Sequence, residues 1–283
     1  MENSKKDIKA IDSKEMISLA FRKIEELFHD YERRNNRVFS GFTGLGFLPG
    51  QLTVIEGYRA TDFALNTARF VAGDDLHVAY ISSKGHEEVS FRLLSSESFI
   101  HLRRLEEGHL EHHDWQQLSS AAGRLSGLPL SINFTRTSSI SEALVLIERI
   151  QEKAPLRMVV VDDPSLIKGK NEFDVLQKLA RSMDVPILIT CKGVSQSDYE
   201  GMDCVYSLAR TTEDSLNVEP LTYGADNNSI LLVKESVMLS SLKVRNADEI
   251  TVPLSYYPEI ATYSHTELII DDFDENPQES SEI

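Results

Sequence analysis

The chain has 283 residues, with 41% hydrophobic and 26% charged residues, which are ordinary values for a soluble globular protein with one large domain. Its formal net charge of −16 argues against strong nucleic-acid binding, because contact with a phosphate backbone is driven by basic surfaces that release counterions. We therefore expect weak or no binding to nucleic acid.

Two further exclusions concern the environment of the chain. The charged stretch before Ser13 has no apolar core and is not a signal peptide, and no run reaches the roughly 20 apolar residues of a membrane span. Cys191 and Cys204 are the only cysteines and lack the spacing of a metal-binding pair, so we expect buried thiols in a reducing compartment. These features favour a cytoplasmic protein with no membrane partner.

Residues 1–37 are predicted to form a separate helical segment. Ser13 is a suitable N-cap, and after it apolar side chains recur at helical spacing and form one stripe. The stripe consists of Ile17, Ala20, Phe21, Ile24, Leu27, Phe28 and Tyr31. A basic loop follows, so the stripe could pack on its own domain or serve a neighbouring molecule. In the second case the anchors would be Ile17, Phe21, Ile24 and Phe28.

Residues 38–266 are predicted to form one α/β domain. The expected strands are Leu52–Ile55, His77–Ser82, Pro129–Phe134, Arg157–Asp163, Pro186–Thr190, Cys204–Ala209, Ser229–Lys234 and Ile250–Leu254. The expected helices span about 63–71, Glu87–Ser95, Phe99–Leu105, Asp114–Leu125, a stretch from Ser139 or Ser141 to about Lys153, and Phe173–Met183. This alternation predicts a mostly parallel, doubly wound sheet with helices on both faces.

The last segment, residues 267–283, is predicted to be a disordered acidic tail. It lacks periodicity and carries many carboxylates, so it cannot bury enough apolar surface to fold alone. Ile269, Ile270 and Phe273 nevertheless place apolar anchors among the acids, as in peptide tails that dock on basic grooves. Solubility is the simpler use of such a tail.

The junction between the first strand and its helix is where an α/β nucleotide-binding domain would hold phosphates. A working phosphate loop needs a Gly, four residues and then Gly-Lys-Ser/Thr, which supply backbone N–H groups, a cation and a Mg²⁺ ligand. Here the loop is shorter and offers only Gly57, Arg59 and Thr61, without a second Gly or a Lys. We expect a junction that keeps the strand–loop–helix geometry of a phosphate loop but has lost the groups that bind phosphate.

With these elements placed, the chain resembles the helicase half of bacterial replicative helicases of the DnaB type, which has a RecA-like fold. The resemblance covers residues 13–255 and is carried by PGQLTVIEG, ALNTARFVA, ISSKGHEEVSFRLLS and the Arg-x-x-x-Gly-x-Leu-x-x-x-Asp-Trp pattern ending at Trp115. The N-terminal helix falls where the family has a linker helix that docks on a neighbouring subunit. The family's N-terminal collar domain has no counterpart. The resemblance implies partners that are copies of the chain itself or replicative helicase subunits.

The departures from the family pattern fall on the catalytic positions that the resemblance implies. No residue matches the phosphate-loop Lys, and Lys84 stands where the family has the carboxylate that polarises the attacking water. Asp162 matches the acidic residue that assists Mg²⁺, but Asp163 replaces a usual Tyr. The sensor Gln is replaced around residues 191–192, and the trans-acting Lys-x-Arg becomes Lys-Glu-Ser at 234–236. Because an arginine finger alone contributes about 10³ to 10⁵ in rate, we expect negligible hydrolysis.

Three smaller groups of residues allow alternative interpretations. His109, His112 and His113, with Glu111 and Asp114, could bind zinc, although a helix start with Asp114 as cap and Trp115 buried is the simpler prediction. Asp162 and Asp163 could retain Mg²⁺ or nucleotide at the carboxyl edge of the sheet. Arg59 could meet an anion at a helix N-terminus, or be solvated or paired with Glu56.

Three hypotheses about function follow from the sequence. The first is a non-catalytic RecA-like protein, linked to DNA replication, that acts by binding copies of itself or an intact helicase and uses no cofactor. The second is an ATPase or helicase with a diverged phosphate loop, in which Arg59, Thr61 and Asp162 contact ATP and Mg²⁺. The third is a DNA-binding scaffold, which the acidity of the chain disfavours.

Overall fold

The computed structural model describes residues 13–42, 44–135, 139–162, 170–191, 193, 201–211, 217–223, 228–245 and 249–264. The chain divides into two compact units, Met1–Arg37 and Val38–Ile283. Among its described residues, the first unit contains one helix of 23 residues, α1 (Ser13–Asn35). Ser13, the residue at which the sequence predicts this helix to start, is the first described residue of α1.

The second unit contains six α-helices and twelve strands among its described residues. The helices are α2 (Ala60–Gly73), α3 (His86–Ser98), α4 (Leu102–Glu107), α5 (His112–Ser126), α6 (Ile140–Gln151) and α7 (Lys170–Met183), with a 3₁₀ turn, η2, at Pro258–Ile260. The first strands are β1 (Val38–Phe39), β2 (Gly46–Phe47), β3 (Leu52–Gly57), β4 (Val78–Ser82), β5 (Leu130–Phe134) and β6 (Met158–Asp162). The remaining strands are β7 (Ile187–Cys191), β8 (Cys204–Arg210), β9 (Asn217–Tyr223), β10 (Asn228–Lys243), β11 (Thr251–Tyr257) and β12 (Thr262–Ser264).

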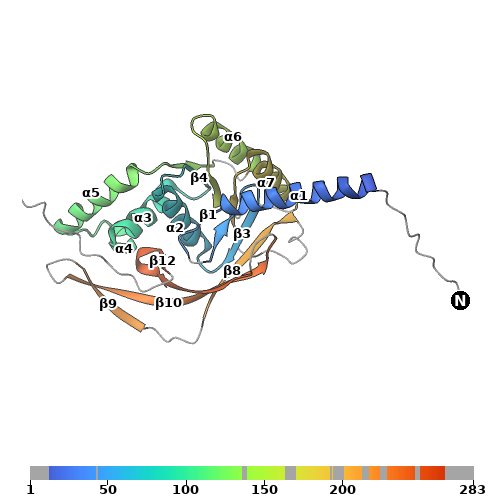
Figure 1. Ribbon diagram of the computed structural model, residues 1–283. Helices are drawn as coiled ribbons and strands as arrows, with labels where there is room; N and C mark the ends of the chain where they lie inside the picture. Colours follow the sequence, from blue (N-terminus) through green and yellow to red (C-terminus); the bar gives the residue numbers. More distant parts are fainter. Residues whose placement is uncertain are drawn as a thin grey trace, which may run out of the picture. The chain divides into compact units, whose positions relative to one another are not determined.

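The main sheet has a parallel half and an antiparallel half (Figure 1). Its strand order is β12-β11-β10-β8-β3-β7-β6-β4-β5. All neighbours from β8 to β5 pair in parallel, as expected for strands that are joined by crossovers returning to the same edge of the sheet. The strands from β8 through β10 and β11 to β12 pair antiparallel. The prediction of a mostly parallel sheet is confirmed.

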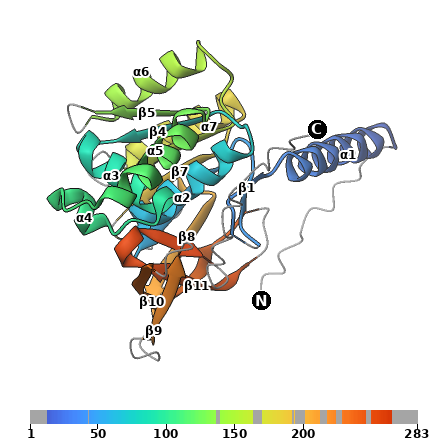
Figure 2. The same ribbon diagram turned by 90° about the vertical axis from the view of Figure 1, so that its left-hand side faces the viewer.

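Helices cover both faces of the parallel half (Figure 2). On one face of the sheet, α2 and α3 share a core cluster with strand residues such as Ile55 and Tyr80. On the other face, α6 and α7 share a second cluster with strand residues such as Val54 and Ile81, which are adjacent to Ile55 and Tyr80 in the sequence. Adjacent residues of one strand point to opposite faces, so a strand buried on both sides must be apolar throughout. This explains the continuous apolar runs in β3, β4, β6 and β7.

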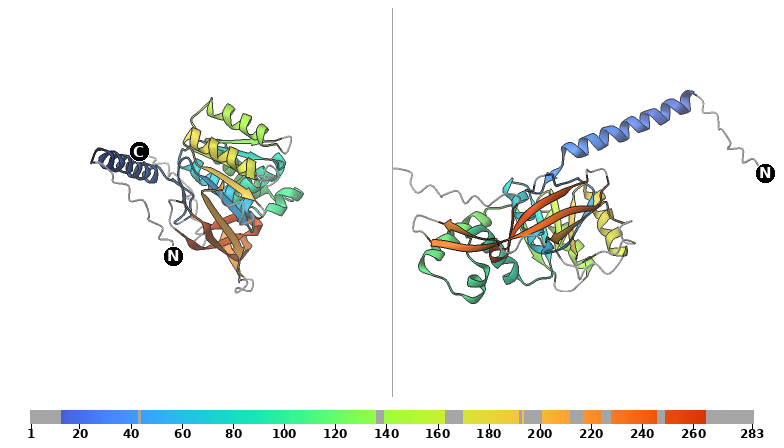
Figure 3. Two further views of the ribbon diagram at one scale, coloured as in Figure 1. Left: turned by 90° about the vertical axis from the view of Figure 1, so that its right-hand side faces the viewer. Right: turned by 90° about the horizontal axis from the view of Figure 1, so that it is seen from below.

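The antiparallel half is larger than the sequence predicted (Figure 3). β10 has 16 residues: its first half pairs with β9, and its second half lies between β8 and β11. The sequence predicted only Ser229–Lys234 of this strand and neither β9 nor β12. Pro220 in β9 and the Ser residues of β10 interrupt the alternation of apolar and polar residues by which a strand is predicted. These strands form because they pair with their neighbours in the sheet.

Two local expectations were wrong. The helix expected from Phe99 begins instead at Leu102, because Phe99 adopts a left-handed conformation (φ 58°) that ends α3. Trp115 is 59% exposed and is not buried, because α5 turns the residues on the other side of the helix, such as Ala121, toward the core. Within the described residues, no helix has both the length and the apolar character needed to cross a membrane.

Candidate functional site

The turn between β3 and α2 is held tightly against β8. Gly57 has a φ of 98°, and a Cβ at this position would lie 2.3 Å from the carbonyl oxygen of Leu208. Only glycine fits such a position, since the close approach and the positive φ both exclude a side chain. Arg59 follows in the left-handed region (φ 51°) as the N-cap of α2, and its exposed guanidinium lies 5.9 Å from the centre of the Tyr58 ring.

Tyr58, in the middle of this turn, is bound by three hydrogen bonds from within the chain. Its N–H donates to the Leu208 carbonyl at 2.8 Å, its carbonyl accepts from the Tyr263 hydroxyl at 2.7 Å, and its own hydroxyl donates to Glu235 Oε2 at 2.6 Å. Burial and Glu235 together raise the pKa of the Tyr58 hydroxyl, which therefore remains a donor. Arg210 also pairs with Glu235, at 3.2 Å. Glu235, the middle residue of the Lys-Glu-Ser stretch, thus holds the β3–α2 turn of the same chain through Tyr58.

Next to this turn, the buried carboxylate of Asp162 collects donors from three elements. Its Oδ1 accepts from the hydroxyl of Thr61 at 2.9 Å and from that of Thr190 at 2.6 Å. Its Oδ2 accepts from the Tyr80 hydroxyl at 2.8 Å. Burial, followed by the charge of Asp162, raises the pKa of Tyr80 well above its ordinary value, so Tyr80 keeps its proton and donates.

The fourth donor to this carboxylate is the ammonium group of Lys84. Lys84 Nζ lies 2.9 Å from Asp162 Oδ2 and also donates to the Thr61 hydroxyl. The Lys84 side chain is 25% exposed, whereas Asp162 is fully buried, so the ion pair closes the outer side of the cluster. The backbone N–H of Lys84 donates to the Ser82 hydroxyl at 3.1 Å, which positions the side chain at the end of β4. We call Thr61, Tyr80, Lys84, Asp162 and Thr190 the Asp162 cluster.

The structure brings some of the predicted site residues together and not others. Thr61 and Asp162 are in direct contact, while Gly57 and Arg59 shape the turn beside them. Asp163 lies outside the described residues. Sequence reasoning missed the roles of Tyr80 and Thr190. Their only signal is a polar tip inside an otherwise apolar strand, and Lys84 was noted only for the carboxylate it replaces.

A second buried carboxylate, Asp62 in the first turn of α2, anchors this helix to its neighbours. It accepts from Arg92 of α3 and, at 2.5 Å, from the Tyr256 hydroxyl of β11. Burial raises the pKa of Asp62, and the charge of Arg92 opposes that shift. These bonds fix the start of α2 between α3 and the antiparallel half of the sheet.

The histidine-rich turn before α5 is organised by its acidic residues. Glu111 is the N-cap of α5, and Asp114 completes a capping box by accepting from the Glu111 N–H at 2.6 Å. Arg104 pairs with the same carboxylate at 2.5 Å. Across the part of the chain that the structure describes, no three His, Cys, Asp or Glu side chains are placed to hold a metal ion together.

The predicted anchors of the N-terminal helix are all more than half exposed. The values are 52% for Ile17, 63% for Phe21, 60% for Ile24 and 56% for Phe28. Met16 and Leu19 are also exposed, at 59% and 43%. Fully burying one such side chain against a partner contributes about 1.5 to 3 kcal/mol.

Comparison with known proteins bears directly on this site. Residues 41–197, more than half of the chain, match the family model of the DnaB-like helicase C-terminal domain. The chain belongs to the DnaB-like helicase C-terminal domain family. The match begins before the β3–α2 turn and includes every member of the Asp162 cluster. The predicted resemblance is confirmed.

Relatives of this DnaB-like domain are replicative helicases. The chain is 31% identical over 167 residues to the replicative DNA helicase DnaB of Synechocystis sp. and 26% identical over 286 residues to the replicative DNA helicase DnaC of Bacillus subtilis. These matches cover 57% and 92% of this chain but only 18% and 63% of the relatives, so the chain spans less than two thirds of either.

Solved structures support the RecA-like fold of the domain. One is a DnaB-like replicative helicase described with its interactions with primase, with a TM-score of 0.66 over 91% of this chain and 67% of that one. Another is a separately solved ATPase domain, with a TM-score of 0.63 over 92% of this chain and 100% of that one. Both are 19% identical in sequence, so they establish the fold alone.

Proposed function

We propose that this DnaB-like domain is catalytically inactive and acts in DNA replication by binding protein, either copies of itself or the subunits of an intact replicative helicase. The observation that carries the proposal is the Lys84 ammonium bound to Asp162 and Thr61. In the family pattern these two residues lie where Mg²⁺ and phosphate are held, and here a cation of the protein itself contacts both.

The Asp162 cluster does not fit a divalent cation. Each carboxylate oxygen already accepts two hydrogen bonds, and Lys84 would place a positive charge directly against the metal. Mg²⁺ demands near-ideal octahedral oxygen coordination and gives up its water reluctantly, so it would have to displace the ammonium first. We therefore propose that no Mg²⁺-nucleotide is used as a cofactor.

The loop before α2 fits a phosphate equally poorly. Phosphate loops bind through free backbone N–H groups, and the N–H of Tyr58 donates to Leu208 instead. The chain also supplies no Lys between Gly57 and Thr61 to neutralise the β- and γ-phosphates. The cation, the loop N–H donors and the general base act in different steps of phosphoryl transfer. Losing all three therefore multiplies the reductions in rate.

The binding role rests on the exposed apolar stripe of α1. Helix-in-groove recognition uses apolar anchors spaced as Ile17, Phe21, Ile24 and Phe28 are. The relatives are named replicative helicases, which makes an intact helicase of the same cell the first partner to test.

A titration with ATP and Mg²⁺ tests the loss of nucleotide binding. A ligand at 100 times its dissociation constant stabilises a protein by about 2.7 kcal/mol, which is a shift of several degrees in melting temperature. We expect no shift and no calorimetric heat for this chain, and a clear shift for a catalytically intact relative measured alongside. A shift together with measurable hydrolysis would overturn the proposal.

One observation favours a second candidate, an ATPase with a diverged phosphate loop. Thr61 and Asp162 remain in contact at the N-terminus of α2, the geometry from which a hydroxyl and a carboxylate could share a cation. Under this alternative the ammonium of Lys84 would leave when nucleotide arrives, with Arg59 near the phosphates. The same titration separates the two candidates.

A further inference from the structure

The main sheet has an open edge at β5. This strand ends the strand order beside β4, and no strand in the described part of the chain pairs on its other side (Figure 2). All five residues of β5 are partly exposed, whereas every residue of β4 and β6 is buried. This difference follows from position, because an edge strand has a flank without a neighbour.

Two hydrogen bonds to β4 fix the direction of the β5 backbone. The N–H of Val78 donates to the carbonyl of Pro129 at 2.9 Å, and the N–H of Thr135 donates to the carbonyl of Ser82 at 2.8 Å. The backbone groups of successive residues alternate between the two sides of a strand. Residues 131 and 133 therefore direct their N–H and C=O toward β4, and residues 130, 132 and 134 direct theirs toward the open side.

The residues with outward backbone groups are also the apolar residues of the strand. Leu130, Ile132 and Phe134 pack against the core cluster of α2 and α3. Ser131 and Asn133 lie on the other face, because side chains alternate along a strand. A strand that pairs with this edge therefore needs apolar residues on the first face and uncharged polar residues on the second.

The edge at β5 lacks the features that usually prevent strand pairing. Natural edge strands are protected by short length, charged side chains, proline or a bulge. The opposite edge strand, β12, has only three residues. β5 has five residues in unbroken register with β4, and Leu130–Phe134 contains no charged residue and no proline.

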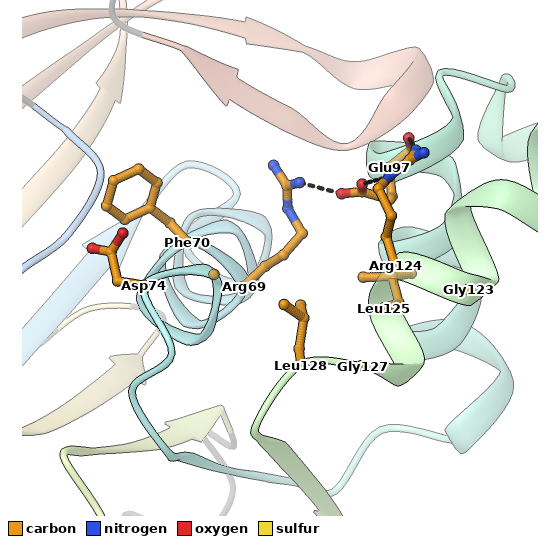
Figure 4. A pocket seen from close by; sticks show the side chains of 10 residues that line it. Arg69, Phe70, Asp74, Glu97, Gly123, Arg124, Leu125, Gly127 and Leu128 are labelled. Atoms are coloured by element: carbon orange, nitrogen blue, oxygen red, sulfur yellow. Dashed lines mark hydrogen bonds and ion pairs between the residues drawn. The ribbon is translucent and has the colours of Figure 1, made fainter. Parts of the chain in front are cut away.

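The apolar face of β5 continues toward α5. The Leu130 N–H donates to the Leu128 carbonyl at 2.8 Å, and Leu128 lines a pocket of about 610 Å³ between the C-terminal parts of α2, α3 and α5 (Figure 4). Leu125 lines the same pocket and packs in the same core cluster. An apolar surface therefore extends from the start of the edge strand onto the neighbouring helix.

We propose that β5 pairs with β5 of a second copy of this chain, antiparallel and about a two-fold axis at Ile132. The two Ile132 residues then exchange N–H···O=C bonds, and the Phe134 N–H donates to the carbonyl of the partner's Leu130. The axis is perpendicular to the sheet, so the apolar face of one copy continues into the apolar face of the other. The two sheets become one continuous sheet.

The sequence of β5 itself favours a second copy as the occupant. Leu-Ser-Ile-Asn-Phe has the alternation that the edge requires, and its centre is an apolar residue with outward backbone groups, so the strand is complementary to itself. The inference rests on the self-association part of the proposed function, for which it specifies a surface apart from α1. It holds whether or not nucleotide binds at the Asp162 cluster.

Cross-linking between two different cysteine variants tests the register of this pairing. Ser131 of one copy lies opposite Asn133 of the other in a non-hydrogen-bonded pair, with Cα atoms about 4.5 Å apart, which suits a disulfide. Two copies of residue 131 lie diagonally, about 7 to 8 Å apart, which is too far. A mixture of the Ser131→Cys and Asn133→Cys chains should therefore form disulfide-linked dimers at least about ten times faster than either chain alone.

The mixture is equilibrated under reducing conditions before oxidation, so that the copies can exchange. The native Cys191 and Cys204 are buried and present in every sample, which makes the single variants the matched controls. A thermal melt of each variant checks that the fold is retained. Equal rates of dimer formation in the mixture and in the single variants would overturn the proposal.

An edge-protecting substitution provides a second test without cross-linking. Asn133→Lys places a charge on the edge and should weaken dimer formation at least about tenfold, measured by sedimentation velocity of the full chain, because a charged side chain disfavours strand pairing. Asn133→Ser keeps a neutral polar residue and should change the dissociation constant by less than about twofold. Equal dissociation constants for the two variants would overturn the proposal.

Failure of this inference can be distinguished from failure of the proposed function. Adding Ile17→Ser and Phe21→Ser to both cysteine chains removes two α1 anchors and should leave the rate of cross-linking in the mixture within about twofold. If no register-specific cross-link forms, while the unmodified chain forms dimers that the α1 substitutions abolish, the β5 pairing is wrong and self-association through α1 stands.

Discussion

At the scale of single residues, Lys84 is the side chain that brings a positive charge to the Asp162 cluster. Its ammonium neutralises a carboxylate that is buried in the sheet and receives only neutral donors otherwise. A buried charge without a partner is costly, whereas a paired and fully hydrogen-bonded charge is tolerated. The charge of Asp162 is thereby paired by a side chain of the same chain.

Replacing Lys84 by Ala should therefore destabilise the fold. We expect a loss of about 1 to 3 kcal/mol in the free energy of unfolding, the lower part of the range for breaking a buried pair, because Lys84 is partly exposed. Urea denaturation measures this change. Lys153→Ala, on an exposed surface residue, is the control and should change stability by less than about 0.5 kcal/mol. Equal effects in the two variants would contradict the interpretation.

Gly57 gives a second prediction at this scale. Gly57→Ala should cost about 2 to 4 kcal/mol, because the added Cβ meets the Leu208 carbonyl and φ is positive. Gly73→Ala, where the Cβ meets open space within a helix, should be neutral or stabilising by up to about 1 kcal/mol. Thermal melting of both variants compares the two. Similar melting temperatures would mean that the turn is not held against β8.

The reactivity of the Cys191 thiol measures how well the end of β7 is buried. Burial, assisted by the charge of Glu56, raises the pKa of its thiol to about 12. The folded chain therefore keeps this thiol protonated up to a pH of about 12, and the unfolded chain releases the proton at a pH of about 8.5. At pH 8 we expect alkylation of Cys191 to be at least about 100-fold slower in the folded chain than in urea, measured by mass spectrometry. Equal rates would show that the strand end is open.

At the scale of elements, the proposed association is assigned to the exposed apolar side chains of α1. The double substitution Ile17→Ser and Phe21→Ser removes two exposed anchors and should weaken association by at least about tenfold, since each anchor contributes about 1.5 to 3 kcal/mol when buried. Sedimentation velocity, alone and with an intact helicase, measures this change. Lys14→Ser with Arg22→Ser is the matched control on the same helix. An equal loss in both variants would assign the effect to helix formation instead.

The antiparallel strands show why some elements were missed. β9 contains a proline and pairs with one strand only, and β10 has serines on both sides of its apolar residues. Such strands are ordered by their partners rather than by their own pattern, so periodicity cannot detect them. The buried parallel strands can be predicted without knowing their partners, because an apolar run bounded by turn residues is sufficient to identify each of them.

At the scale of the whole molecule, net charge governs the encounter with nucleic acid. A charge of −16 repels a phosphate backbone over about 8 Å at physiological salt. We expect a dissociation constant for single-stranded DNA above about 10⁻⁴ M at 0.15 M salt, weaker than ordinary non-specific binding. Fluorescence anisotropy measures it, with an intact relative as positive control. Tight, salt-sensitive binding would show that a local basic patch overcomes the overall charge.

The sequence by itself determined the α/β class, the parallel core strands, the family and the absence of a lysine between Gly57 and Thr61. These are properties of local pattern and residue type, which each segment carries without its neighbours. Only the tertiary structure decided which side chains meet at the β3–α2 turn and around Asp162. The contacts of Lys84 with Asp162, of Tyr58 with Leu208 and of Glu235 with Tyr58 join residues from different elements that lie far apart along the chain. The periodicity of the sequence cannot predict these contacts, because they form only when the folded sheet brings the side chains together at one edge.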